Sequence, residues 1–148
     1  MPMSPPRGRT SAGIAGAAIL LATLAGCGQS EYCKAVEDNR VALNSLGEKR
    51  TNAAYLSYAR ALRAVANQAP PKVRKDWIKL ADVTGDVVKA QRQAGISLED
   101  MLDEDKITTV PPEKLKLLND AYEAFNNTQN ERKAVVKNAK DECEITLS

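Results

Sequence analysis

After residue 30, apolar side chains recur every three or four positions along most of the chain, and no stretch alternates regularly between apolar and polar residues. This spacing is typical of amphipathic helices, whereas half-buried strands have a period of two. The pattern therefore predicts an all-α fold. Its apolar stripes define four main helices, near residues 31–48, 51–69 and 71–93 and from Pro111-Pro112 to about Cys143.

Residues that start or stop helices lie at the ends of these stripes. Ser30 and Thr51 are suited to cap the first and second helices, because their hydroxyls can accept hydrogen bonds from free backbone N–H groups. Pro70-Pro71 ends the second helix and opens the third, since proline fits the first turn of a helix and not its interior. Gly95 ends the third helix. A short helix is expected near 97–102 and a loop over 103–110.

Polar residues interrupt two of the stripes. The segment Asn-Asn-Thr-Gln-Asn at 126–130 has weak helix propensity, so a bend is expected in the last helix. Gln129 and Arg132 fall on the apolar stripe of that helix and make its seam polar in the middle. Asn39 lies on the first stripe and is expected to be partly exposed, the alternative being a buried residue that fixes helix register.

The first residues have the pattern of an export signal. Residues 1–13 contain Arg7 and Arg9 and no acid, and residues 14–25 are apolar and uncharged. This order is typical of a signal peptide, and the apolar run is too short to span a bilayer. The following Leu24-Ala25-Gly26-Cys27 resembles the lipobox of bacterial lipoproteins. The resemblance implies that Cys27 is acylated on sulfur and that the chain is cleaved before it. An ordinary signal peptide cut elsewhere and an uncleaved anchor are the alternatives.

This reading divides the chain into a removed signal peptide (1–26), a lipidated Cys27 with a short tether (27–30), and a helical bundle domain (31–148). Only three residues separate Cys27 from the first predicted helix. Three extended residues reach about 10 Å, so the domain is expected to lie close to the membrane, on its extracytoplasmic face.

Two cysteines remain once Cys27 is assigned to the lipid. An oxidising exterior favours a Cys33–Cys143 disulfide, and two free thiols or a metal-binding pair are the alternatives. Four helices joined by short connections favour an antiparallel bundle. In such a bundle the first helix begins at the end of the molecule where the fourth helix finishes. Cys33 and Cys143 would then lie close together, as a disulfide requires.

Composition removes several classes of function. The chain contains no histidine, which excludes Ser-His and Cys-His nucleophiles and the commonest metal ligand. Sequence motifs of hydrolases, nucleotide-binding proteins and zinc proteases are also absent. The net charge of +2 comes from Arg7 and Arg9, because the rest of the chain has as many basic as acidic side chains. We therefore expect no enzyme activity, no cofactor, no metal and no nucleic-acid partner.

Three groups of side chains are candidates for binding. Aromatic residues lie on or beside the apolar stripes; we expect them in the core, and a pocket for a ligand is the alternative. Acidic residues gather over 99–105, where an exposed loop is favoured over a weak calcium site, since their spacing does not match an EF-hand. The aromatic group is Tyr32, Tyr55, Tyr58, Trp77, Tyr122 and Phe125, and the acidic group is Glu99, Asp100, Asp103, Glu104 and Asp105.

The third group is basic and lies at the start of the third helix. Lys72, Arg74, Lys75 and Lys79 are opposed there only by Asp76. Each such cation near an anionic membrane surface contributes up to about 1 kcal/mol. Lys72, Arg74 and Lys75 are therefore candidates for contact with anionic lipid, and an ordinary solvated helix face is the alternative.

Several short motifs resemble those of small secreted lipoproteins common in actinobacteria. They are Tyr32-Cys33, Ala69-Pro70-Pro71 with Val73-Arg74-Lys75-Asp76-Trp77, and the late Cys143 with its short tail. The resemblance implies an α-helical extracytoplasmic domain and brings no assigned activity or functional residues.

The expected function is that of a membrane-anchored, non-enzymatic binding or structural module. Its expected partner is the membrane, through the lipid on Cys27, and a membrane-associated protein is a second candidate. The alternative function is a carrier that binds a small apolar ligand or lipid between its helices.

Overall fold

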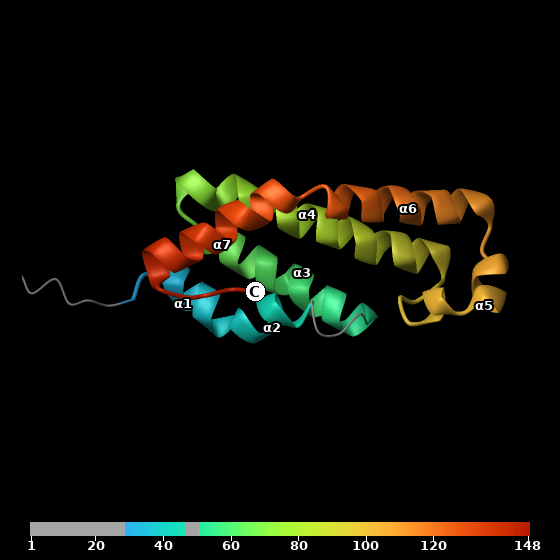
Figure 1. The fold of residues 1–148 in the computed structure, drawn as a ribbon, viewed down its shortest axis with the longest axis horizontal. Coiled ribbons are helices and arrows are strands. Elements are labelled where there is room, and N and C mark those ends of the chain that lie inside the picture. The colour runs from blue at the N-terminus through green and yellow to red at the C-terminus, as the bar shows by residue number, and fades with distance from the viewer. Residues whose placement is uncertain (1–28, 47–50) are drawn as a thin grey trace, which may run out of the picture.

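The computed structural model describes residues 29–46 and 51–148, and within these ranges the regular structure is entirely helical (Figure 1). The predicted signal peptide and Cys27 lie outside the described residues. The elements are α1 (Glu31–Asp38), α2 (Arg40–Ser45), α3 (Asn52–Gln68), α4 (Pro71–Ala94), the 3-10 helix η1 (Asp100–Leu102), α5 (Glu104–Thr108), α6 (Pro112–Asn126) and α7 (Gln129–Cys143). The all-α prediction is confirmed.

The predicted helix ends are also confirmed. The Ser30 hydroxyl accepts a hydrogen bond from the Cys33 N–H at 3.1 Å, and the Thr51 hydroxyl accepts one from Ala54 at the same distance. Pro71 is the first residue of α4. Gly95 ends α4 with a φ of 71°, a left-handed conformation that glycine adopts without steric cost.

Two of the four predicted helices are broken into shorter ones. Asn39 separates α1 from α2, is half-buried, and its amide donates a hydrogen bond to the Ala35 carbonyl at 2.8 Å. Asn127 and Thr128 separate α6 from α7, where a bend was predicted. The buried Thr128 hydroxyl donates to the Phe125 carbonyl at 2.6 Å, which gives this carbonyl a partner at the break.

The segment 103–110 was predicted to be a loop, and this prediction is wrong. Residues 104–108 form the short helix α5. The Asp103 carboxylate accepts hydrogen bonds from the N–H groups of Asp105 and Lys106, so it caps a helix that the apolar pattern is too short to reveal. The short helix predicted near 97–102 is present as η1, and the Ser97 hydroxyl accepts from the Asp100 N–H.

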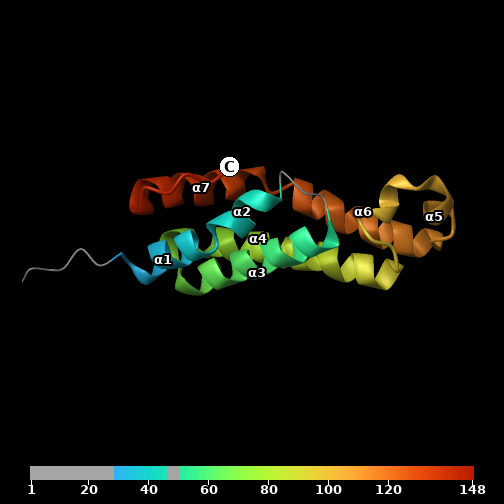
Figure 2. The ribbon, with the colours of Figure 1, turned by 90° about the horizontal axis from the view of Figure 1, so that it is seen from below.

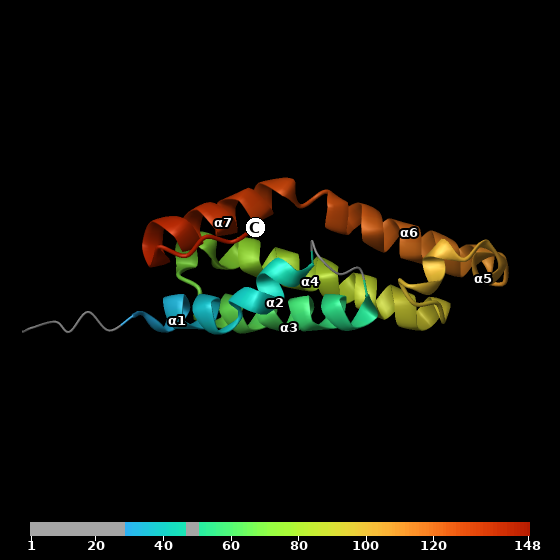
Figure 3. The same ribbon diagram turned by 60° about the horizontal axis from the view of Figure 1, so that its bottom comes forward.

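The helices lie along one long axis (Figures 1 and 3). The pair α1–α2 and the long helix α4 run in one direction, and α3 and the pair α6–α7 run in the other. Helix α4 packs against α3, α6 and α7. Towards one end, α4 and α6 extend beyond the other main helices, and only η1 and α5 accompany them (Figure 2). The structure does not confirm a simple four-helix antiparallel bundle, because two helices are broken and the bundle thins towards this end.

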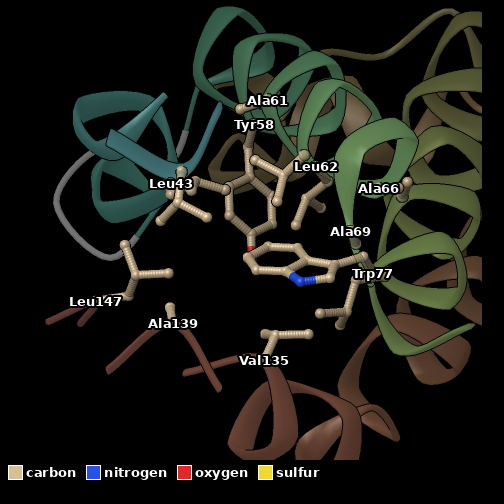
Figure 4. Close-up of a cluster of buried hydrophobic side chains, with 14 of the residues drawn as sticks. Leu43, Tyr58, Ala61, Leu62, Ala66, Ala69, Trp77, Val135, Ala139 and Leu147 are labelled. Atoms are coloured by element: carbon tan, nitrogen blue, oxygen red, sulfur yellow. The ribbon is translucent and has the colours of Figure 1, made fainter. Parts of the chain in front are cut away.

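Buried apolar side chains form two cores. The larger one, here called the disulfide-end core, centres on Trp77, which packs beside Tyr58 with Leu62, Val135 and Leu147 around them (Figure 4). The smaller one, the far-end core, lies between the second half of α4, the segments beside η1 and α5, and helix α6. Its buried residues are Ala90, Ala94, Ile96, Val110 and Leu118.

The predicted disulfide between Cys33 and Cys143 is present and joins α1 to the end of α7, with 5.2 Å between the two Cα atoms. Beyond it, Glu144 adopts a φ of 58° and turns the chain back over the core. Ile145 and Leu147 are buried there, and the Ser148 N–H donates to the Asn44 side-chain carbonyl at 3.0 Å. In the described ranges, no helix combines the length and the apolar character that a membrane crossing requires.

Candidate functional site

A cavity of about 430 Å³ lies beside the disulfide-end core, and Tyr122 in its wall packs against both cores. Aromatic rings from α3 and α6 form much of its wall, α2 and the segment after α4 add leucines, and α7 adds one arginine. The lining residues are Leu43, Leu46, Tyr55, Tyr58, Leu98, Tyr122, Phe125, Asn126, Arg132 and Ser148.

The rings that line the cavity also contact one another. Tyr55 lies 6.2 Å from Tyr122 with an interplanar angle of 80°, and 5.6 Å from Phe125 with an angle of 47°, measured between ring centroids. Edge-to-face and tilted pairs of this kind are favourable because the positive edge of one ring meets the negative face of another. The aromatic wall is therefore held in place by its own packing.

Arg132 is the charged residue of the cavity wall. Its guanidinium lies 4.4 Å from the centre of the Phe125 ring. Its Nη2 donates to the Phe125 carbonyl at 2.9 Å, and its Nε donates to the Thr128 hydroxyl at 3.2 Å. These contacts fix the side chain across the break between α6 and α7. A cation over a ring face is stabilised by the ring quadrupole.

Burial raises the pKa of two tyrosines of the cavity, Tyr58 and Tyr122. It raises the pKa of Tyr122 to about 12, although the Gln91 amide that donates to the Tyr122 hydroxyl at 2.7 Å lowers it. Burial also raises the pKa of Tyr58, and the charge of Arg132 partly offsets that rise. At neutral pH the cavity therefore presents neutral hydroxyls and one permanent cation.

The six aromatic residues singled out in the sequence divide between the cavity and the core. Tyr55, Tyr58, Tyr122 and Phe125 line the cavity. Tyr32 lies in the disulfide-end core, and its hydroxyl accepts from the Trp77 indole N–H at 3.2 Å. Trp77 borders a side chamber of about 60 Å³, which shares Leu43, Tyr58, Arg132 and Ser148 with the cavity.

The basic group lies at the end of the molecule where α1 begins. Lys72, Arg74 and Lys75 are exposed on the first turn of α4. A hollow of about 460 Å³ between Ser30, Pro70, Arg74 and other residues joins the α3–α4 turn to the start of α1. The Arg74 Nε donates to the Ala69 carbonyl at 2.8 Å, so this residue also stabilises the turn.

The acidic group at 99–105 has local partners. Asp100 forms an ion pair with Lys106, which lowers the pKa of Asp100. Glu99 accepts a hydrogen bond from the Asn52 N–H at 3.3 Å, and Asp103 caps α5. Across residues 29–46 and 51–148, no group of three or more cysteine and carboxylate side chains is placed to hold a metal ion.

Sequence reasoning missed Arg132 as a site residue. The signal was present, because an arginine on an apolar stripe must pair, reach solvent or face a cavity. Its neighbourhood depends on α2, α3 and the C-terminal segment, which the spacing within one helix does not reveal.

Comparisons of this chain with protein-family models, with curated proteins and with solved structures give no match.

Proposed function

We propose that this protein is a non-enzymatic binding module that holds a small apolar ligand in its aromatic cavity. The proposal is based on the cavity itself. The cavity is partly open to solvent, and its volume of about 430 Å³ falls in the size range of small-molecule sites. Its rings and leucines supply apolar surface, and its hydroxyls and Arg132 supply polar groups.

The chemistry of the wall favours holding a ligand over converting it. The titratable groups that line the cavity are tyrosines and Arg132. The pKa values of Tyr58 and Tyr122 are raised above the ordinary value of 10, and arginine stays charged. Proton transfer at neutral pH is most efficient when the pKa of the group lies near the pH. These groups are therefore poorly suited to general acid–base catalysis.

Titration with octanol tests the cavity. Trp77 is the sole tryptophan and borders the side chamber, so its fluorescence should report binding, with calorimetry as an independent measurement. Leu98→Phe adds bulk to the cavity wall and should weaken octanol binding. Leu117→Phe adds the same bulk at an exposed position of α6 and is the matched control. If the wild-type protein binds neither octanol nor octanoate, an anion of the same chain length, the proposal is contradicted.

We propose further that an acylated Cys27 anchors the module to the outer face of the cell membrane, as in the lipoproteins that the chain resembles. Support comes from the start of the fold, because α1 is capped at Ser30, three residues after Cys27. Intact-mass measurement of protein purified from its native membrane tests this proposal. A mature mass without acyl chains would contradict it.

The basic group would set the orientation of the anchored domain. Lys72 and Lys75 form no ion pair within the described ranges and project from the end where α1 begins. In a soluble chain that begins at Gly28, Lys72→Glu with Lys75→Glu should lower binding to anionic vesicles. Arg74 is left unchanged because it stabilises the α3–α4 turn. The control is Lys89→Glu with Arg92→Glu, which reverses two exposed charges further along α4. Equal binding by both variants would contradict this orientation.

A further inference from the structure

The charge of Arg132 has no counter-ion within the part of the chain that the structure describes. Its guanidinium contacts a carbonyl, a hydroxyl and a ring, all of them neutral. The ion pairs of the described residues involve other cations on exposed surfaces. A half-buried cation without a carboxylate partner carries a desolvation cost, which an anionic ligand would offset.

The guanidinium retains donors for such a ligand. Arginine has five N–H groups in a rigid fork, and Arg132 uses one on Nε and one on Nη2 for its own hydrogen bonds. Both N–H groups of Nη1 and the second of Nη2 remain. Two donors on neighbouring nitrogens match the two oxygens of a carboxylate. Because the Phe125 ring and carbonyl hold the side chain, little rotamer freedom is lost on binding.

Two charges near the cavity would orient the ligand. Arg132 and Tyr58 border both the cavity and the side chamber, so the guanidinium and a neutral hydroxyl lie on the same side. Glu99 lies outside the lining and accepts from the Asn52 N–H, and its charge contributes to the raised pKa of Tyr122. An anionic group is attracted to Arg132 and repelled by Glu99. Leucine and aromatic side chains line the space for an apolar body.

We infer that the ligand is an amphipathic carboxylate, an apolar chain that ends in one carboxylate, with the carboxylate bound by Arg132 beside the side chamber. This inference rests on the proposed function, because it assigns the class of ligand to the same cavity.

The test compares octanoate with octanol, which share a chain length and differ in charge. Calorimetry and Trp77 fluorescence are measured on the full processed protein. A hydrogen-bonded pair with a charged group contributes enough for the wild-type protein to bind octanoate about tenfold more tightly than octanol. Arg132→Met should remove this preference, and Arg132→Lys should retain part of it. Lys133→Met removes an exposed charge from the next position of α7 and should leave the preference unchanged.

The ratio of the two affinities separates recognition from folding. If Arg132 only supports the junction of α6 and α7, Arg132→Met will weaken octanoate and octanol equally, and the inference is overturned. Equal affinities in the wild-type protein overturn it as well, while the proposed function stands. If neither compound binds, the proposed function itself fails.

Discussion

The two ends of the molecule are stabilised in different ways. The disulfide-end core draws buried side chains from α1, α2, α3, α4, α7, the C-terminal segment and, through Phe125, the end of α6. Cys33–Cys143 closes it covalently. The far-end core lies mainly between α4 and α6, and two of its buried residues are alanines. Hydrophobic stabilisation grows with the apolar area removed from water. The far end should therefore unfold locally at a lower free energy than the disulfide end.

The wall of the cavity contacts both cores. Leu43 and Tyr58 come from the disulfide-end core, whereas Tyr122 packs against both cores. Tyr122 is therefore the residue through which a change in the far-end core would reach the wall of the cavity.

Of the changes considered, removing the disulfide should lower the free energy of unfolding most. Cys33 and Cys143 are 110 positions apart, and closing a loop of that order stabilises a protein by about 4.7 kcal/mol in the chain-entropy model. Cys33→Ser with Cys143→Ser should lower the free energy of unfolding in urea by up to that amount. Reduction of the wild-type protein is the control and should give a similar loss. A loss below about 1 kcal/mol would show that packing alone holds this end together.

Truncating one leucine in each core tests the comparison directly. Leu62 and Leu118 are both 1% exposed. Leu→Ala in a core costs about 2–5 kcal/mol, with the larger values where neighbours cannot close the cavity. We expect Leu62→Ala to lie near the upper value and to speed amide hydrogen exchange throughout the molecule. Leu118→Ala should lie near the lower value and speed exchange mainly in α6 and the end of α4. Equal effects would contradict separate stabilities for the two ends.

The sequence was sufficient for features that depend on neighbouring residues. Hydroxyl caps at Ser30 and Thr51, the proline start of α4 and the glycine end at Gly95 act within one turn of helix. These predictions need the identity of a residue and its position in a stripe, and little else. The disulfide needed more, because it was favoured by an expected oxidising exterior and by an antiparallel arrangement of the main helices, with two free thiols or a metal-binding pair as the alternatives.

Other features depend on distant parts of the chain. Periodicity predicts which face of a helix is buried and does not show whether the neighbouring face fills the space. The cavity exists because α2, α3 and α6 leave a gap between their side chains. On α7, Val135 is buried and Val136 is only half-buried. The last predicted helix is two helices, α6 and α7, so one apolar stripe does not describe both.

Tyr122, which packs against both cores, makes the free energy of unfolding depend on pH. Burial raises the pKa of Tyr122 to about 12, above its unfolded value of about 10. The folded state then holds this proton more tightly than the unfolded state, so stability is full below pH 10 and falls as the pH rises towards 12. Urea unfolding at pH 8 and pH 11 checks this expectation. Tyr122→Phe should reduce the loss between the two conditions, and an unchanged loss would assign it to other groups.

Replacing Gly85 should change the free energy of unfolding least. Gly85 lies in α4, the helix that contributes to both cores. It occupies the interior of α4, and a Cβ built there meets no atom within 4 Å. Glycine in a helix interior costs about 0.5–1 kcal/mol relative to alanine, chiefly through backbone entropy. Gly85→Ala should therefore raise the free energy of unfolding by about that amount and slow exchange at both ends. Gly95→Ala is the matched control, because the φ of 71° at Gly95 makes alanine unfavourable and reverses the sign. If Gly85→Ala destabilises the protein, backbone entropy does not decide the effect at this position.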